Sequence, residues 1–277
     1  MKKKCRNIPL KVISYLILIM LIIFSIFPAV WMVLTSIKPA TEIYKSPPEF
    51  FANDPTIENY KQTINSNVPR AFLNSTIVTF STIILTLVIA IPAGYGLIKN
   101  RSKFTGVASV SLLFGQMMPA IIVLIPLFNI FNKINLIDTY YALILANLTI
   151  TLPLSVLMFR SFFRKVPKEL EEAALVDGCT SLGAIFRILI PISKPGIISV
   201  IIFSFIISWD EYLYALNFSR SASIKTLPII LSEYTTIYSV DWGGMMSAST
   251  IVSLPVILIF LIANKYFVKG LYEGSIK

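Results

Sequence analysis

The chain has 277 residues, of which 56% are hydrophobic, and its mean hydropathy is +0.78. A soluble domain of this size could not cover so much apolar surface, so the composition predicts a polytopic membrane protein. The formal net charge is +10, but the basic residues stand in short runs beside apolar segments, which membrane topology explains better than nucleic-acid binding. The chain contains no histidine, which excludes Ser-His catalysis, imidazole bases and histidine metal ligands.

Six apolar segments reach the ~20 residues needed to cross a hydrocarbon core and predict an all-α membrane protein with six transmembrane helices. The predicted spans are residues 12–37, 71–98, 104–132, 139–159, 197–218 and 243–264. Asp210 and Glu211 interrupt the fifth of them. The first has the basic start of a signal peptide, but its apolar run is too long and no small-residue cleavage site follows, so we expect a retained helix. Residues 1–277 then form a single transmembrane domain.

The distribution of Lys and Arg predicts the orientation. With a cytosolic N-terminus and six crossings, 17 of the 24 basic residues fall on the cytosolic side and 7 outside. Because cytoplasmic loops carry the excess of Lys and Arg, both termini are expected in the cytosol. The longest external loop then covers about residues 38–70, where five prolines predict irregular chain with short helical turns.

A cytosolic loop of about residues 163–195 has the pattern of a helix, a turn and a second helix. Pro167 suits the first helical position because its missing N–H would be unpaired there. The helix dipole favours three acidic residues in the first turns, Glu169, Glu171 and Glu172. Gly178 fits a C-terminal cap with positive φ, Thr180 or Ser181 can cap the second helix, and Pro191 and Pro195 are expected to end it before the next span. The apolar stripe of the second helix is Leu182, Ile185, Phe186 and Leu189.

Within this loop, residues 172–191 read EAALVDGCTSLGAIFRILIP. The spacing of Glu-Ala-Ala, Gly178, Ile188, Ile190 and Pro191 resembles the EAA loop of the membrane subunits of binding-protein-dependent ABC importers, with Ile190 where that loop has Leu. In that family the loop docks on a separate ATPase. The resemblance therefore assigns ATPase docking to Glu172, Ala173, Ala174, Asp177 and Gly178. Periodicity alone would also fit an interfacial helix pair lying on the bilayer, and the motif spacing favours docking.

The resemblance extends along most of the chain and is to the second membrane subunit of maltose-type carbohydrate transporters. The similar segments are residues 35–39, 72–75, 125–127, 208–212 and 266–271, with Asp210 where many members have Asn. It implies a bacterial cell-membrane importer that moves a sugar or oligosaccharide by alternating access. Its partners would be a second permease subunit, two ATPase subunits, an extracellular solute-binding protein and membrane lipid. In the maltose type the tail after Lys265 also contacts the ATPases.

The chain itself is expected to be a transport subunit rather than an enzyme. None of its 11 glycines begins the phosphate-cradling pattern G-x-x-x-x-G-K-[ST]. We therefore expect no cofactor or metal on this chain, and place ATP and Mg²⁺ on the partner ATPase.

Polar residues in the spans are candidates for the substrate path. Trp209 could stack on a sugar, and the carboxylates of Asp210 and Glu211 could accept hydrogen bonds from sugar hydroxyls. Equally, the two carboxylates could lie in the headgroup zone and end the helix. Gln116 is a fourth candidate, although interhelical hydrogen bonding is favoured for it and for Asn147.

Other functional classes remain as alternatives. An importer of the same architecture could carry a non-sugar solute, although the predicted spans hold no Lys or Arg to attract an anion. A secondary transporter or channel would be expected to show an inverted repeat or paired intramembrane charges, and the sequence shows neither. A membrane enzyme would need a convergent catalytic set, which is also missing.

Overall fold

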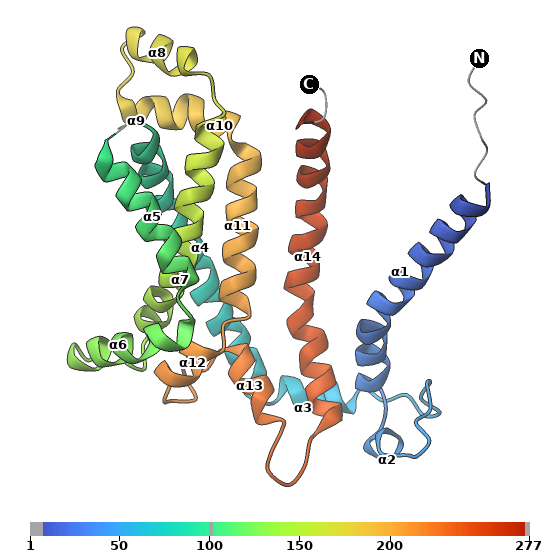
Figure 1. Cartoon of the computed structure of the whole chain (residues 1–277). Helices are drawn as coiled ribbons and strands as arrows, with labels where there is room; N and C mark the ends of the chain where they lie inside the picture. Colours follow the sequence, from blue (N-terminus) through green and yellow to red (C-terminus); the bar gives the residue numbers. More distant parts are fainter. Residues whose placement is uncertain (1–7, 100–101, 275–277) are drawn as a thin grey trace. The chain divides into compact units, whose positions relative to one another are not determined.

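The computed structural model describes residues 8–99 and 102–274 and, within these, the side chains of residues 11–99 and 102–262. The described part is built from helices, and its one β-bridge joins Thr235 and Val240. The chain separates into two compact units, Met1–Ser66 with Glu233–Val252 and Asn67–Ser232 with Ser253–Lys277 (Figure 1). The prediction of a single domain stays a prediction. The tail expected to contact ATPases lies outside the described side chains.

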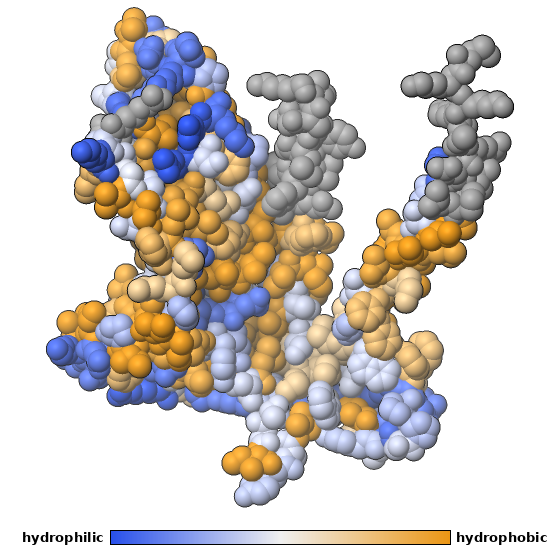
Figure 2. Space-filling model, viewed as in Figure 1, coloured by the Kyte–Doolittle hydropathy of each residue, from blue (hydrophilic) through white to orange (hydrophobic). Residues whose placement is uncertain are grey.

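The first unit contains α1 (Ile8–Ser36), α2 (Ala40–Ile43), α3 (Glu58–Ile64) and the start of α14 (Trp242–Gly274). Large apolar side chains cover the exposed sides of α1, as a helix facing lipid requires (Figure 2). The amide of Asn59 donates to the carbonyls of Ser36 and Lys38, each at 2.9 Å. The hydroxyls of Thr63 and Ser247 lie 2.6 Å apart. The loop after α1 therefore contains the short helical turns predicted for it. Hydrogen bonds from α3 connect this loop to the end of α1 and to the start of α14.

In the second unit, α4 (Val68–Lys99), α7 (Tyr140–Phe163) and α11 (Lys194–Trp209) pack side by side (Figure 1). The contact of α4 with α7 is very close, because a Cβ on Gly94 would lie 2.6 Å from the Cβ of Phe159. Small hydroxyl residues line the packed interior, a composition typical of helix interfaces in membranes. The buried hydroxyl residues of these helices include Thr79, Thr82, Thr86, Thr151, Ser155 and Ser204.

Helices α4 and α7 run parallel. Tyr140 donates to the Oδ1 of Asn74 at 2.6 Å near their starts, and the hydroxyls of Thr86 and Thr151 lie 2.9 Å apart further along. Two consecutive parallel spans need a connection that crosses the membrane back to the side on which the first span began. Here that connection is α5 (Lys103–Met117) followed by α6 (Ala120–Lys133), so the bent pair acts as one crossing.

By length and composition the described chain has four membrane-spanning helices, or six if each of two bent pairs counts as one span. The third predicted span is broken into two helices, because α5 and α6 meet at 100°. Met118 is extended (φ −71°, ψ 125°), the conformation that the following proline favours. The fifth span is also shorter than predicted. Helix α11 ends at Trp209, and α12 (Leu213–Phe218) and α13 (Leu227–Glu233) follow as separate short helices.

Candidate functional site

The segment predicted as helix, turn and helix lies beyond the ends of α7 and α11 (Figure 1). It begins with α8 (Lys168–Val176), and Pro167 is the residue just before the helix rather than its first residue. Gly178 has φ +84°, and Cys179 donates its N–H to the carbonyl of Ala174 at 2.9 Å. This is the glycine cap that the sequence predicts. Thr180 then caps α9 (Ser181–Ala184), because its hydroxyl accepts the N–H of Gly183 at 3.1 Å.

The second helix widens before it ends. A π-helical turn, η1 (Ile185–Leu189), leads into α10 (Ile190–Ile192), so the helix ends between Pro191 and Pro195, as predicted, with Pro191 itself inside its last turn. Proline has no N–H to donate, and its ring crowds the carbonyl four residues before it. The chain adapts by a wider turn in which the N–H of Ile190 donates to the carbonyl of Ile185.

The apolar stripe predicted for this helix divides between two surfaces. Ile185 and Leu189 are 3% and 1% exposed, whereas Leu182 and Phe186 are 63% and 66% exposed. The buried pair joins an apolar cluster drawn from all three spanning helices. Its other buried members are Ala90, Tyr95, Val156, Phe159, Phe163, Val166 and Val200. A displacement of η1 would therefore press directly on α4, α7 and α11.

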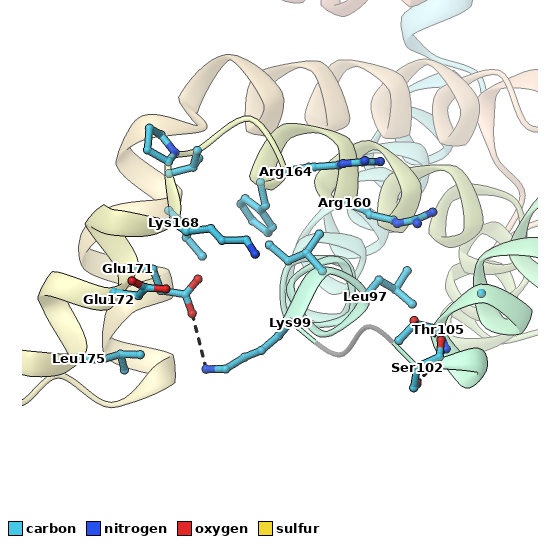
Figure 3. Close-up of a pocket in the computed structure, with 16 residues that line it drawn as sticks. Leu97, Lys99, Ser102, Thr105, Arg160, Arg164, Lys168, Glu171, Glu172 and Leu175 are labelled. Atoms are coloured by element: carbon cyan, nitrogen blue, oxygen red, sulfur yellow. Dashed lines mark hydrogen bonds and ion pairs between the residues drawn. The ribbon is translucent and has the colours of Figure 1, made fainter.

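A polar network ties the same segment to the end of α4. The Nζ of Lys99 donates to the hydroxyls of Tyr95 and Ser181, each at 2.8 Å. It also lies 3.6 Å from the Oε1 of Glu171 (Figure 3). Tyr95 also donates a short hydrogen bond to Glu171. We call Tyr95, Lys99, Glu171 and Ser181 the anchor. The sequence gives no signal for it, because its members come from three helices and only Tyr95 and Lys99 are neighbours on one of them.

All five predicted docking residues lie on α8 and its cap. Glu172, Ala173, Asp177 and Gly178 are exposed, while Ala174 is buried. Helix α8 thus presents an acidic and small-residue surface on one side and is held on the other.

A cavity of about 660 Å³ opens between α8, the ends of α4 and α7, and the first turn of α5 (Figure 3). Its polar side chains include Lys99, Arg160, Arg164, Lys168, Glu171 and Glu172. The cavity therefore adjoins the anchor, and a ligand there would touch the ends of three helices.

The structure gives other partners to two of the four substrate-path candidates. Trp209 is 2% exposed and stacks on Phe205, with ring centroids 5.3 Å apart. Stacking on a sugar would require its neighbours to move. The carboxylate of Glu211 accepts the N–H groups of Tyr214 and Ala215 at 2.6 and 2.9 Å, so it caps α12.

The other two candidates, Asp210 and Gln116, are exposed. Gln116 lines a small hollow of about 80 Å³ together with Thr149 and Tyr214. The amide nitrogen of Asn147 donates to the carbonyl of Leu143 in its own helix at 2.9 Å, rather than forming the interhelical bond expected for it. The substrate roles stay predictions.

Residues 83–272 match the family described as binding-protein-dependent transport system inner membrane component, and the chain belongs to this family. The sulfoquinovosyl glycerol transport system permease protein SmoH of Agrobacterium fabrum is 33% identical over 258 residues, covering 93% of this chain and 90% of the relative. The trehalose/maltose transport system permease protein MalG of Thermococcus litoralis is 30% identical over 263 residues, covering 94% of each.

The fold is also found among solved structures. A chain of a bacterial ABC transporter involved in the import of the acidic polysaccharide alginate superposes with a TM-score of 0.83 at 18% identity, covering 96% of this chain and 99% of that one. The family predicted from the EAA spacing is therefore confirmed, and the protein is a multi-pass transport permease of the cell membrane.

Proposed function

We propose that this protein is one of two permease subunits of an ATP-driven importer that carries a sugar or oligosaccharide into the cytoplasm. Two ATPase subunits, which bind ATP and Mg²⁺, and an extracellular solute-binding protein would complete the assembly. The substrate class is supported by the two relatives described above, whose names specify sulfoquinovosyl glycerol and trehalose/maltose.

The observation that carries the proposal is the double attachment of the α8–η1 segment. Ile185 and Leu189 enter the apolar cluster, while the anchor joins α8 and α9 to α4. A pull on α8 by a moving ATPase would therefore displace the spanning helices together rather than bend a loose loop. Rigid-body rocking of helices around a central site is how such a movement would alternate access to the substrate.

The exposed side of the segment has the composition of a docking surface. The acidic Glu172 and Asp177 stand beside apolar side chains that are well exposed, such as Val176 at 87% and Phe186 at 66%. Exposed apolar groups framed by charges are typical of partner contacts. We assign this surface to the ATPase.

The orientation follows from where the basic residues gather. Lys99, Arg160, Arg164, Lys168 and Lys194 lie at the ends of α4 and α7, on α8, or at the start of α11. Because positive charge marks the cytoplasmic side, α8 would face the cytosol, where an ATPase is found. Asp210 and Gln116 remain the candidates for sugar contact, while Trp209 and Glu211 would first have to leave their present partners.

Reconstitution of the complete importer in proteoliposomes tests the function. Binding protein loaded with a carbohydrate should stimulate ATP hydrolysis and uptake together. Lys99→Met removes the Nζ contacts of the anchor and should reduce uptake per ATP hydrolysed, whereas Lys103→Met, a nearby cation outside the anchor, should not. Stimulation by non-carbohydrate solutes alone would contradict the substrate class. Unchanged coupling in Lys99→Met would contradict the role given to the anchor.

A further inference from the structure

The cavity beside α8 carries more positive charge than its own carboxylates balance. Among the residues lining it, four are basic and two are acidic. Lys99 is paired with Glu171. For Arg160, Arg164 and Lys168, no carboxylate of the described side chains lies within the 4.0 Å of an ion pair. Arg160 and Arg164 extend from the end of α7, and Lys168 reaches in from α8 (Figure 3).

The first turn of α5 adds to the attraction for an anion. Ser102, Thr105 and Gly106 line the cavity at the N-terminal end of this 15-residue helix. The positive end of the helix dipole favours a negative ligand there, while the N–H groups of Thr105 and Gly106 donate to Ser102, each at 3.4 Å. A Cβ on Gly106 would meet no atom within 4 Å, so the turn borders open space.

The rest of the lining is apolar, which suits an amphiphile better than a small soluble ion. Leu97, Ile98, Phe163, Val166, Leu175 and Leu189 form this part of the lining. Next to the cavity, α5 presents further apolar side chains, with Phe104 77% and Val107 65% exposed. An acyl chain could lie along α5 while a charged headgroup occupied the cavity.

We propose that this cavity binds the phosphate headgroup of an anionic glycerophospholipid. Arg160 and Arg164 stand at positions i and i+4 at the end of α7, and guanidinium groups match phosphate oxygens in a way that an ammonium does not. Basic pockets between spanning helices on the cytoplasmic side are suited to such headgroups. A lipid held there would connect α7, α5 and α8, and would brace the α8–η1 segment at the membrane surface. The site rests on the proposed orientation for its leaflet, but it uses none of the exposed docking residues except Glu172 at its edge.

Native mass spectrometry of the assembled transporter tests the site. The transporter is titrated with phosphatidylglycerol or with phosphatidylcholine that carries the same acyl chains. Arg160→Gln with Arg164→Gln should weaken phosphatidylglycerol binding about thirtyfold, since one basic residue near the surface contributes about fivefold. Phosphatidylcholine binding should stay the same. The matched control is Lys133→Gln with Arg220→Gln, which removes two charges from connections on the other side of the spans and should bind phosphatidylglycerol as the wild type does.

Equal phosphatidylglycerol affinity in the wild type and the Arg160/Arg164 variant, or an equal loss in the control, would overturn the proposal. Inorganic phosphate, added against chloride at constant ionic strength, separates the two sources of the anion. Displacement of the lipid by millimolar phosphate would identify a site for a soluble anion and overturn the lipid assignment. If the double variant does not assemble, Arg164→Gln alone decides, because this side chain is exposed; a loss of about fivefold is then expected.

Discussion

Substitutions at Gly178 separate the shape of the α8 turn from its chemistry. The residue has φ +84°, and a Cβ there would meet no atom within 4 Å. Gly178→Ala therefore introduces backbone strain without a clash, at a cost of about 1–2 kcal/mol for a left-handed alanine. The population of the native turn should fall about 5- to 30-fold. Asparagine tolerates this conformation better, so Gly178→Asn should lose less.

Gly178→Pro is the severe member of the series. Proline fixes φ near −65° and removes the N–H that donates to the carbonyl of Leu175 at 3.1 Å, so the native turn cannot form. If the ATPase recognises α8 in this geometry, transport and ATPase association should be abolished while membrane insertion remains intact. Glu172→Lys should have the same result by reversing a charge on the docking surface.

The assay is a titration of the solubilised permease pair with the purified ATPase subunit. Affinity should decrease in the order Gly, Asn, Ala, Pro. Gly96→Ala is the matched control, because Gly96 lies within α4 and a Cβ there also meets no atom within 4 Å. Wild-type ATPase affinity and uptake in Gly178→Pro would refute the docking assignment, and an equal loss in Gly96→Ala would show that the effect is not specific to the turn.

Three further substitutions test the fold and the substrate path. Gly94→Ala should lower the free energy of unfolding of the detergent-solubilised protein by about 1–3 kcal/mol, because the added Cβ would press on Phe159 and nearby backbone. An unchanged unfolding curve would contradict the close packing of α4 on α7. Glu211→Ala should lower the free energy of unfolding by about 1 kcal/mol, because the α12 cap is lost, and should leave the affinity for sugar unchanged. A loss of sugar affinity without a loss of stability would instead support Glu211 as a sugar contact. Backbone N–H groups, first that of Ser221, hold the pKa of Asp138 below its usual value. Its stabilising effect should therefore be present above pH ~4 and disappear as the pH falls further, so the wild type and Asp138→Asn should unfold alike in acid; a difference that persists there would contradict this account.

Features governed by local chemistry could be predicted from the sequence. Gly178 takes the positive φ that its position after an amphipathic run predicts, and Thr180 caps the next helix. Four of the six predicted spans, the first, second, fourth and sixth, form helices close to their predicted bounds, because a segment that must cross lipid has to satisfy its own backbone. The family followed from the spacing of one loop because that spacing is unusual.

The fate of the prolines could not be predicted in this way. Pro92 and Pro153 lie inside continuous helices, whereas the chain breaks before Pro119 and widens into a π-turn before Pro191. Each proline removes the same N–H, and only the packing around it decides whether the helix bends, widens or stops.

Contacts between residues that lie far apart in the sequence could not be predicted either. The anchor joins Lys99 to Glu171, and Trp209 packs edge-on against Phe72 with centroids 5.7 Å apart. An aromatic residue at the end of a span gives the same sequence pattern whether it meets a sugar or another ring. Sequence pattern therefore does not separate a sugar contact from a packing contact at this position, whereas the geometry of the loop is set by neighbouring residues.

The most direct test of the account is to solubilise this chain in detergent from cells that also express its genomic neighbours, and to identify what co-purifies with it. We expect an ATPase and a second permease in stable association, with the ATPase lost from the Gly178→Pro variant. A chain that purifies alone and still transports solute without ATP would contradict the importer, and would favour a secondary transporter.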